Sequence, residues 1–192
     1  MPFIDSWPKD ASVWDVFRAD LRIYTPFIAF TEALMRGPSS LSVPERELIA
    51  AYVSRLNSCE FCYGGHSAAA AELGVDPDLF DELFDDLETA PVDDAVKPIL
   101  RLVRKLTRQP SHVVQADVDA VFEAGWDEKA YRDAVAICAY FNYMNRIADG
   151  FGIEDIPDRR AAIGRGNARF GYASRFKEAL ANEGYPGLLS EE

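Results

Sequence analysis

The sequence of 192 residues is poor in cysteine, and its three cysteines are an odd number. A small secreted protein that depends on disulfides carries more of them, in pairs. A disulfide-stapled scaffold is therefore excluded. The C-x-x-C pair of Cys59 and Cys62 indicates redox chemistry or metal binding instead. The third cysteine, Cys138, lies among apolar residues, and we expect it to pack in the core.

Basic residues are also scarce, since 20 Lys and Arg stand against 32 Asp and Glu and the net charge is −12. Such a chain repels phosphate backbones, so nucleic-acid binding has little electrostatic support. The uncharged apolar stretches are far shorter than the roughly 20 residues that a membrane-spanning helix needs. The N-terminal segment lacks the basic and apolar regions of a secretory signal. We therefore expect a cytoplasmic protein without a membrane partner.

No stretch alternates between apolar and polar residues strongly enough to predict a β-strand. Helical periodicity dominates, so we predict an all-α fold in a single domain over residues 1–192. N-terminal helices are expected over 11–37 with a break at Pro26, and a helix-prone C-terminal extension interrupted by glycines is expected over 157–183. The helices expected between them run from the start signal at 42–45 through Leu56, over 60–74, from the cap at 76–77 through Leu87, from about 94 through Leu106, and over 116–124 and 128–150.

Two segments at the ends of long predicted helices resemble each other, namely 70–75 (AAELGV) and 148–153 (ADGFGI). A helix-start signal precedes each long helix, at residues 44–45 in one case and 127–128 in the other. A degenerate duplication of a helical unit, with the C-x-x-C in one copy, would explain this similarity. A chance match between residues that commonly end helices would explain it as well.

The segment 59–66 (CEFCYGGH) carries the residues best suited to chemistry. Positions three or four apart share a helix face, so Cys59 and Cys62 can approach each other and His66 lies one turn beyond Cys62. A cysteine is nucleophilic only as the thiolate, and both a helix N-terminus and an imidazole favour that form. We expect the two glycines after Tyr63 to leave the face beside Cys62 open to a substrate.

Glu47 on the preceding predicted helix is the candidate third partner, because small residues along its helix face allow close packing. A carboxylate in contact with His66 would orient the imidazole and stabilise its charged form. Two cysteines, a histidine and a carboxylate also form a set that zinc accepts, although their spacing is not that of zinc fingers. The alternative to a redox enzyme is therefore a redox-sensing or zinc-binding interaction module without turnover.

Glu47, eleven intervening residues and C-x-x-C-x-x-x-H resemble the core signature of the alkylhydroperoxidase AhpD-like proteins of the carboxymuconolactone decarboxylase superfamily. The resemblance is concentrated in the core motif, residues 41–74, and residues 141–146 (FNYMNR) resemble the branch called peroxidase-related enzymes. It implies an AhpD-like helical bundle that forms a homo-oligomer. We expect Asn142, Asn145 and Arg146 to hold the second helix pair together and not to act in catalysis.

The resemblance also implies site roles: Cys62 would be the attacking thiol, Cys59 the resolving thiol, and His66 and Glu47 the proton relay. The implied enzyme is a thiol-dependent peroxidase or disulfide reductase that acts on hydroperoxides or on protein and small-molecule disulfides. The best-studied members carry a second histidine between the cysteines where this chain has Phe61, which favours disulfide exchange. Decarboxylases of the superfamily typically lack the C-x-x-C. No glycine-rich dinucleotide motif is present, so we expect no bound cofactor and an external thiol or redox protein as electron donor.

Overall fold

The protein, seen in a computed structural model, is described over residues 1–182, and within these residues every regular element is a helix. The all-α prediction is therefore confirmed, while the last residue of the predicted 157–183 extension lies outside the described residues. No helix within 1–182 is both long and apolar enough to cross a membrane. The α-helices are α1 (Val13–Ala19), α2 (Leu21–Arg36), α3 (Val43–Leu56), α4 (Glu60–Glu72), α5 (Leu79–Asp85), α6 (Val96–Arg108), α7 (Gln115–Glu123), α8 (Glu128–Gly150), α9 (Pro157–Phe170) and α10 (Lys177–Asn182). Two short 3-10 helices, Pro110–His112 and Ser174–Phe176, complete the set.

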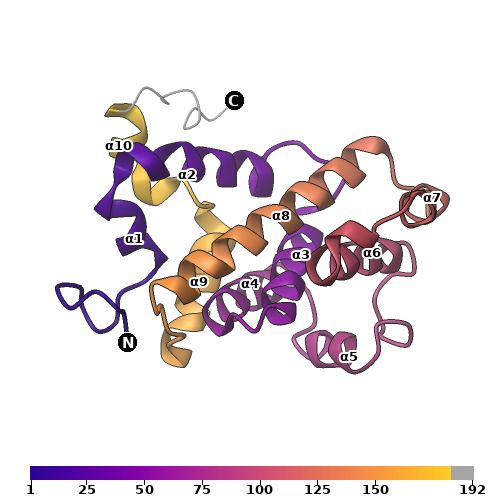
Figure 1. The fold of residues 1–192 in the computed structure, drawn as a ribbon, viewed down its shortest axis with the longest axis horizontal. Helices are drawn as coiled ribbons and strands as arrows, with labels where there is room; N and C mark the ends of the chain where they lie inside the picture. The colour runs from indigo at the N-terminus through magenta and orange to yellow at the C-terminus, as the bar shows by residue number, and fades with distance from the viewer. Residues whose placement is uncertain (183–192) are drawn as a thin grey trace.

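The helices α3, α4 and α8 form the centre of the molecule (Figure 1). The consecutive helices α3 and α4 pack against each other as a hairpin, α8 crosses them, and α9 covers α4. On one side of this centre α1 and α10 pack against α2, and on the other side α6 packs against α7. The apolar core runs through all of these layers, so residues from both halves of the chain meet around α4.

The start of α3 and its connection to α4 follow the predicted signals. The hydroxyl of Ser42 accepts the N–H of Glu45 at 3.4 Å, and the Glu45 carboxylate accepts the N–H of Ser42 at 2.6 Å, which forms a capping box. After α3, Ser58 adopts the left-handed region with φ of 60° and turns the chain sharply. The N–H of Cys59 then bonds the Ser54 carbonyl at 3.0 Å, so this tight turn places Cys59 directly at the start of α4.

The predicted helix break at Pro26 is wrong. Pro26 lies inside α2, and the chain breaks instead at Asp20, whose carboxylate accepts the N–H of Ile23 at 3.3 Å. A proline within a helix removes one backbone hydrogen bond. The helix continues here because its other face is anchored in the core by residues such as Ile28 and Met35, which are almost completely buried.

Two glycines allow α4 and α9 to pack closely against each other. A β-carbon on Gly164 of α9 would lie 2.6 Å from the carbonyl carbon of Ala68 on α4. A β-carbon on Gly64 of α4 would lie 2.7 Å from Nε of Arg160 on α9. The expectation that Gly64 leaves an open face is therefore wrong, because α9 covers it. The expected interruption at Gly164 is also wrong, because this glycine permits a close helix contact within a continuous α9.

The two similar segments, 70–75 and 148–153, end their helices in the same way. Each contains a glycine with positive φ, Gly74 at 97° and Gly152 at 68°, followed by an amide that bonds a carbonyl five residues earlier. Gly125 after α7, with φ of 94°, forms the same cap. A cap shared by three helix ends accounts for the similarity, and the duplication of a helical unit stays a prediction.

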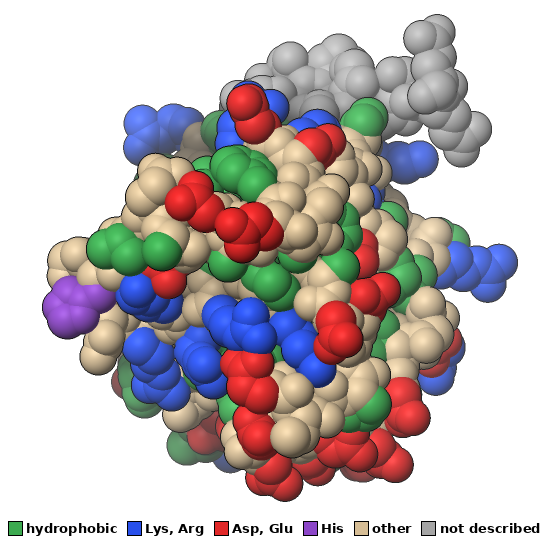
Figure 2. All heavy atoms as spheres, turned by 90° about the vertical axis from the view of Figure 1, so that its right-hand side faces the viewer, with side chains coloured by type: hydrophobic (Ala, Val, Ile, Leu, Met, Phe, Trp, Pro, Cys, Tyr) green, Lys and Arg blue, Asp and Glu red, His purple; other side chains and the backbone are tan. Residues whose placement is uncertain are grey.

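Basic side chains gather on the exposed face of α6 (Figure 2). The opposite face of α6 is buried. Acidic side chains pair with basic residues of the exposed face: Arg101 pairs with Glu88, and Nζ of Lys105 lies 2.6 Å from Oδ2 of Asp117. These pairs reduce the positive charge that Arg101 and Lys105 would offer to a phosphate group.

The α4–α9 contact predicts that Gly164→Ala lowers the free energy of unfolding by about 1–3 kcal/mol, because the added methyl group overpacks against the α4 backbone. The matched control is Gly150→Ala in α8, where no heavy atom lies within 4 Å of the new β-carbon. This control should be neutral or stabilising by up to about 1 kcal/mol, since glycine is a poor helix former. Urea unfolding followed by circular dichroism measures both values. Equal stabilities of the two variants would contradict the close contact.

Candidate active site

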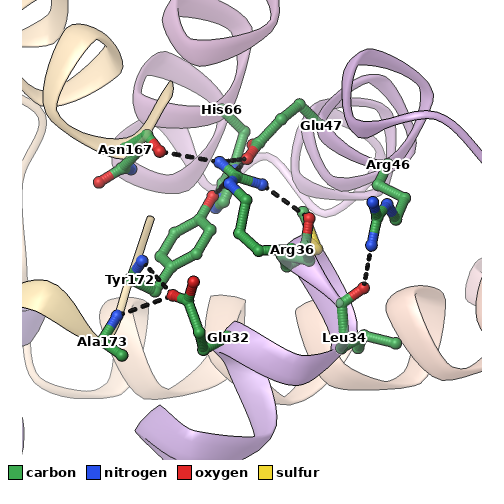
Figure 3. A network of polar contacts seen from close by, with 10 residues as sticks. Glu32, Leu34, Arg36, Arg46, Glu47, His66, Asn167, Tyr172 and Ala173 are labelled. Carbon is green, nitrogen blue, oxygen red and sulfur yellow. Dashed lines mark hydrogen bonds and ion pairs between the residues drawn. The ribbon is translucent and has the colours of Figure 1, made fainter. Parts of the chain in front are cut away.

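Glu47 on α3 is completely buried, and its carboxylate receives hydrogen bonds from three other segments of the chain (Figure 3). Oε2 lies 2.7 Å from Nδ1 of His66 on α4, so the predicted contact between these two residues is present. Oε1 accepts hydrogen bonds from Nη2 of Arg36 at 2.6 Å and from the hydroxyl of Tyr172 at 2.7 Å. Buried charges persist only when they are paired and hydrogen-bonded. These donors therefore fix both the charge and the orientation of Glu47.

The proton positions in this network follow from its electrostatics. Burial alone would raise the pKa of Glu47, but the hydrogen bond and charge of His66, the charge of Arg36 and the Tyr172 hydroxyl outweigh it and lower that pKa. Burial, followed by the charge of Glu47, raises the pKa of Tyr172 well above its usual value. Glu47 is thus an ionised acceptor and Tyr172 a neutral donor. Because an ionised carboxylate only accepts, Nδ1 of His66 carries a proton, so Nε2 is the nitrogen that can accept a proton whenever the ring is neutral.

The two cysteines lie together at the start of α4, with Cys59 at the N-cap and Cys62 in the first turn. Both are free thiols. The hydrogen bond to the Cys62 sulfur, followed by burial, raises the pKa of Cys59 far above its usual value. Cys59 therefore stays protonated and can donate its S–H to Cys62.

Cys62 and His66 share the wall of one narrow pocket. Its volume, counted as the space open to the centre of a water molecule, is about 60 Å³, which admits a few water molecules. Cys59 is completely buried and is not among the described residues that line the pocket, whereas Cys62 keeps 7% of its surface exposed. A molecule in the pocket therefore meets Cys62 first. The mainly apolar walls include Phe17, Ile28, Phe61, Phe141, Met144 and Ile163.

Asn145 on α8 secures the turn that presents the cysteines. It is almost completely buried, and its Oδ1 accepts Nδ2 of Asn57 at 2.8 Å. Its own Nδ2 donates to the hydroxyl of Ser54 at 3.0 Å. Asn142 accepts a second hydrogen bond from Asn57 at 3.1 Å. Both asparagines thus hold helices together, as expected, and they tie α8 to the end of α3 immediately before Cys59.

No pattern in the sequence singles out Arg36 or Tyr172, which complete the surroundings of Glu47. Arg36 ends α2, where a basic residue is common for local reasons. Tyr172 follows a glycine and is 125 positions from Glu47. The available signal is indirect: a glutamate on a closely packed helix face requires a cationic partner and further donors somewhere in the chain. Nothing in the local sequence says which residues these are.

The buried carboxylate predicts a pH-dependent loss of stability in Glu47→Gln. At neutral pH this variant should lose about 3–5 kcal/mol of unfolding free energy, because Arg36 is left without its counter-charge. Since folding lowers the pKa of Glu47, its contribution is present above the unfolded glutamate pKa, near 4.3, and is lost as the pH falls through the lower folded value. The difference between wild type and variant should therefore shrink below about pH 4.3.

Urea unfolding at a series of pH values measures this difference. The control is Glu123→Gln, which changes an exposed glutamate at the end of α7 and should follow the wild type at every pH. A difference between wild type and Glu47→Gln that stays constant across the acidic range would contradict an ionised Glu47.

Known proteins share the part of the chain that carries this site. The sequence model of the carboxymuconolactone decarboxylase family matches residues 22–104, from α2 to α6, which include Glu47 and His66 but not Tyr172. The uncharacterised protein YdfG of Bacillus subtilis (strain 168) is 31% identical over 114 residues, which are 59% of this chain and 78% of that protein.

Two solved structures share the fold. One is an uncharacterised peroxidase-related protein from Silicibacter sp. TM1040, with a TM-score of 0.71, 29% identity and coverage of 76% of each chain. The other is an uncharacterised peroxidase-related protein from Ralstonia eutropha JMP134, described as an alkylhydroperoxidase AhpD core, with a TM-score of 0.72, 26% identity and coverage of 80% of each chain. The helical fold is therefore AhpD-like, and with the sequence matches it establishes that this chain belongs to the carboxymuconolactone decarboxylase family.

Proposed function

We propose that the protein is a thiol-dependent oxidoreductase in which Cys62 and Cys59 cycle between dithiol and disulfide while reducing a hydroperoxide or a disulfide. The observation that carries the proposal is the pocket that Cys62 shares with His66, whose Nδ1 is held by Glu47. The structural neighbours described as peroxidase-related support the same chemistry. The apolar walls favour an organic substrate over a strongly hydrated one.

With a hydroperoxide, Cys62 gives its proton to Nε2 of His66 and attacks a peroxide oxygen as the thiolate. A sulfur–oxygen bond forms as the oxygen–oxygen bond breaks, so Cys62 becomes a sulfenic acid and an alkoxide leaves. His66 returns the proton to the alkoxide, which departs as an alcohol. Glu47 stays ionised throughout and keeps the imidazole oriented, which is the role of the carboxylate in a catalytic triad.

Cys59 then attacks the sulfur of the Cys62 sulfenic acid. A sulfur–sulfur bond forms, and the hydroxyl group leaves with the Cys59 proton as water. The two electrons accepted by the peroxide thus come from the two thiols. An external dithiol or redox protein restores them by thiol–disulfide exchange. With a disulfide substrate, Cys62 attacks a sulfur atom instead, and Cys59 resolves the mixed disulfide.

Phe61 bears on the choice between these substrates. It lines the pocket but offers no group that transfers a proton, so His66 alone among the described lining residues contributes an imidazole. Peroxide cleavage needs a proton for the alkoxide, whereas a thiolate leaves a disulfide without one. The proposal therefore includes disulfide exchange as its second substrate class.

The zinc-binding alternative would have to rearrange this site. Within residues 1–182, no group of three His, Cys, Asp or Glu side chains is placed to hold a metal ion. Both oxygens of Glu47 already accept hydrogen bonds, and Nδ1 of His66 faces Glu47. A redox-sensing module without turnover would retain the thiol geometry, and it differs from an enzyme in lacking catalytic cycles.

The proposal extends to self-association and to a reducing location such as the cytoplasm, where free thiols persist. Ile23 and Phe30 on α2 and Tyr143 on α8 are exposed apolar or aromatic residues, and Tyr143 stacks on Phe27 of α2. An exposed face of this kind suits contact with a second copy of the chain. Sedimentation measurements that show only a monomer would contradict this part of the proposal.

Substitution of each cysteine tests the mechanism. Cys62→Ser should reduce turnover of cumene hydroperoxide or lipoamide, with dithiothreitol as donor where required, to the background rate. Cys59→Ser should consume one equivalent of hydroperoxide and accumulate a Cys62 sulfenic acid that dimedone traps. Cys138→Ser is the matched control, because the Cys138 thiol is buried against Thr107 on α6 and is not among the described residues that line the pocket. This variant should keep wild-type turnover.

Thiol titration of the native protein before and after reduction accompanies these assays. Two additional fast-reacting thiols that appear on reduction and vanish in Cys59→Ser and Cys62→Ser support the proposal. Turnover that survives Cys62→Ser would overturn it. Thiols that are released only by a chelator would favour the zinc-binding module instead.

A further inference from the structure

We infer that Tyr172 is a positioning residue of this site: it fixes the Glu47 carboxylate and thereby holds His66 with Nε2 as the atom that exchanges a proton with Cys62. The inference rests on the proposed function for the chemistry at Cys62. Tyr172 lies outside the segment that matches the family model, so the family match does not imply this role.

The hydroxyl of Tyr172 contacts both members of the Glu47–His66 pair. It donates to Oε1 of Glu47 at 2.7 Å and lies 3.3 Å from Nδ1 of His66. The ring lies beneath the Arg36 guanidinium, 4.9 Å from its central carbon, and stacks on the His66 ring with centroids 6.1 Å apart. Among the side chains that the structure describes, which exclude those of residues 175, 179 and 183–192, no other has a polar atom within hydrogen-bond distance of both Glu47 and His66.

The main chain around Tyr172 is fastened to α2 (Figure 3). The carboxylate of Glu32 accepts the N–H of Tyr172 at 2.6 Å and that of Ala173 at 2.8 Å. Gly171 has a φ of 66°, and a β-carbon there would lie 2.5 Å from Oε1 of Glu32. This close approach requires glycine. By binding the main chain at Tyr172 and Ala173, Glu32 positions the tyrosine side chain next to Glu47.

The two oxygens of the Glu47 carboxylate have different hydrogen-bond partners, and this explains why the Tyr172 hydroxyl affects the orientation of His66. Arg36 and Tyr172 together occupy Oε1, which leaves Oε2 for Nδ1–H of His66. Without the hydroxyl, Arg36 alone restrains Oε1, so the carboxylate gains rotational freedom and His66 loses a fixed acceptor. Since Phe61 supplies no proton-transfer group, the pocket depends on the orientation of this one imidazole.

Other charged and titratable groups lie near Cys62 and His66, but none of those described replaces the Tyr172 hydroxyl as a donor to Glu47. The hydroxyl of Tyr140 on α8 shares a hydrogen bond with the hydroxyl of Thr31, and the thiol of Cys59 forms a hydrogen bond with the sulfur of Cys62. These groups include Glu32 and Arg36 from α2, Glu47 from α3, Cys59 from α4, Tyr140 and Asp149 from α8, and Tyr172.

The test compares Tyr172→Phe, which removes only the hydroxyl, with the wild type. The matched control is Tyr52→Phe, because Tyr52 is also buried but bonds Arg104 and does not line the pocket. The first readout is the pH profile of iodoacetamide alkylation at Cys62 of the reduced protein, quantified by peptide mass spectrometry. Tyr172→Phe should shift the profile upward by about one pH unit and slow alkylation at neutral pH about tenfold. Tyr52→Phe should overlay the wild type.

The second readout is the tautomer of His66 from nitrogen-15 NMR. The chain has two histidines, so His112→Gln identifies the His66 signals. The neutral wild-type ring should carry its proton on Nδ1, and Tyr172→Phe should show a mixture of both tautomers. An unchanged alkylation profile together with an unchanged tautomer in Tyr172→Phe would overturn the inference.

A double-mutant cycle tests the contribution of Glu32. Glu32→Ala should shift the alkylation profile in the same direction as Tyr172→Phe, and it should add nothing further in the Tyr172→Phe background. Full additivity of the two effects would contradict delivery of Tyr172 by Glu32. Neither alkylation nor NMR requires turnover, so both readouts report on positioning even if the proposed function fails. Cys62-dependent turnover combined with unchanged readouts in Tyr172→Phe would overturn this inference alone.

Discussion

A negative charge shielded from solvent at Glu47 is the constraint on which the site depends. Removing a carboxylate from water costs several kcal/mol unless donors replace the lost water. The donors come from α2, from α4 and from the segment after α9, so the charge is balanced only when these three parts of the chain have assembled. The apolar core brings the helices together, and the polar network determines how the imidazole and the thiols face the pocket.

The positions of Glu47, Cys62 and His66 can be predicted because the sequence signals that fix them are local. The capping box at Ser42 fixes the start of α3, and helical spacing places Cys62 and His66 on one face of α4. Helices joined by so short a turn must pack together, which brings Glu47 to His66. Tyr172 cannot be found in this way, because no helix period or spacing relates it to Glu47 and only tertiary packing joins the two.

Two errors of the sequence analysis have a common physical origin. Proline and glycine weaken isolated helices, so Pro26 and Gly164 were expected to interrupt α2 and α9. In the folded protein, burial along one face of α2 offsets the hydrogen bond that the proline removes. In α9 the missing side chain of Gly164 permits close approach to α4, so the packing gain requires the same glycine that lowers helix propensity. Where a helix is packed along its length, tertiary packing outweighs the low helix propensity of single residues.

The contacts of Tyr172 join residues that are far apart in the sequence, and this affects the order of folding. Glu47 and Tyr172 lie 125 positions apart, and Glu32 and Tyr172 lie 140 apart. Contacts of such length close large loops and form late, whereas the α3–α4 hairpin with its two thiols is local and forms early. A newly made chain therefore passes through an interval in which Cys59 and Cys62 are adjacent but the outer wall of the pocket is missing. During that interval any oxidant that is present would reach the two thiols without first entering the pocket that Cys62 and His66 line in the complete fold.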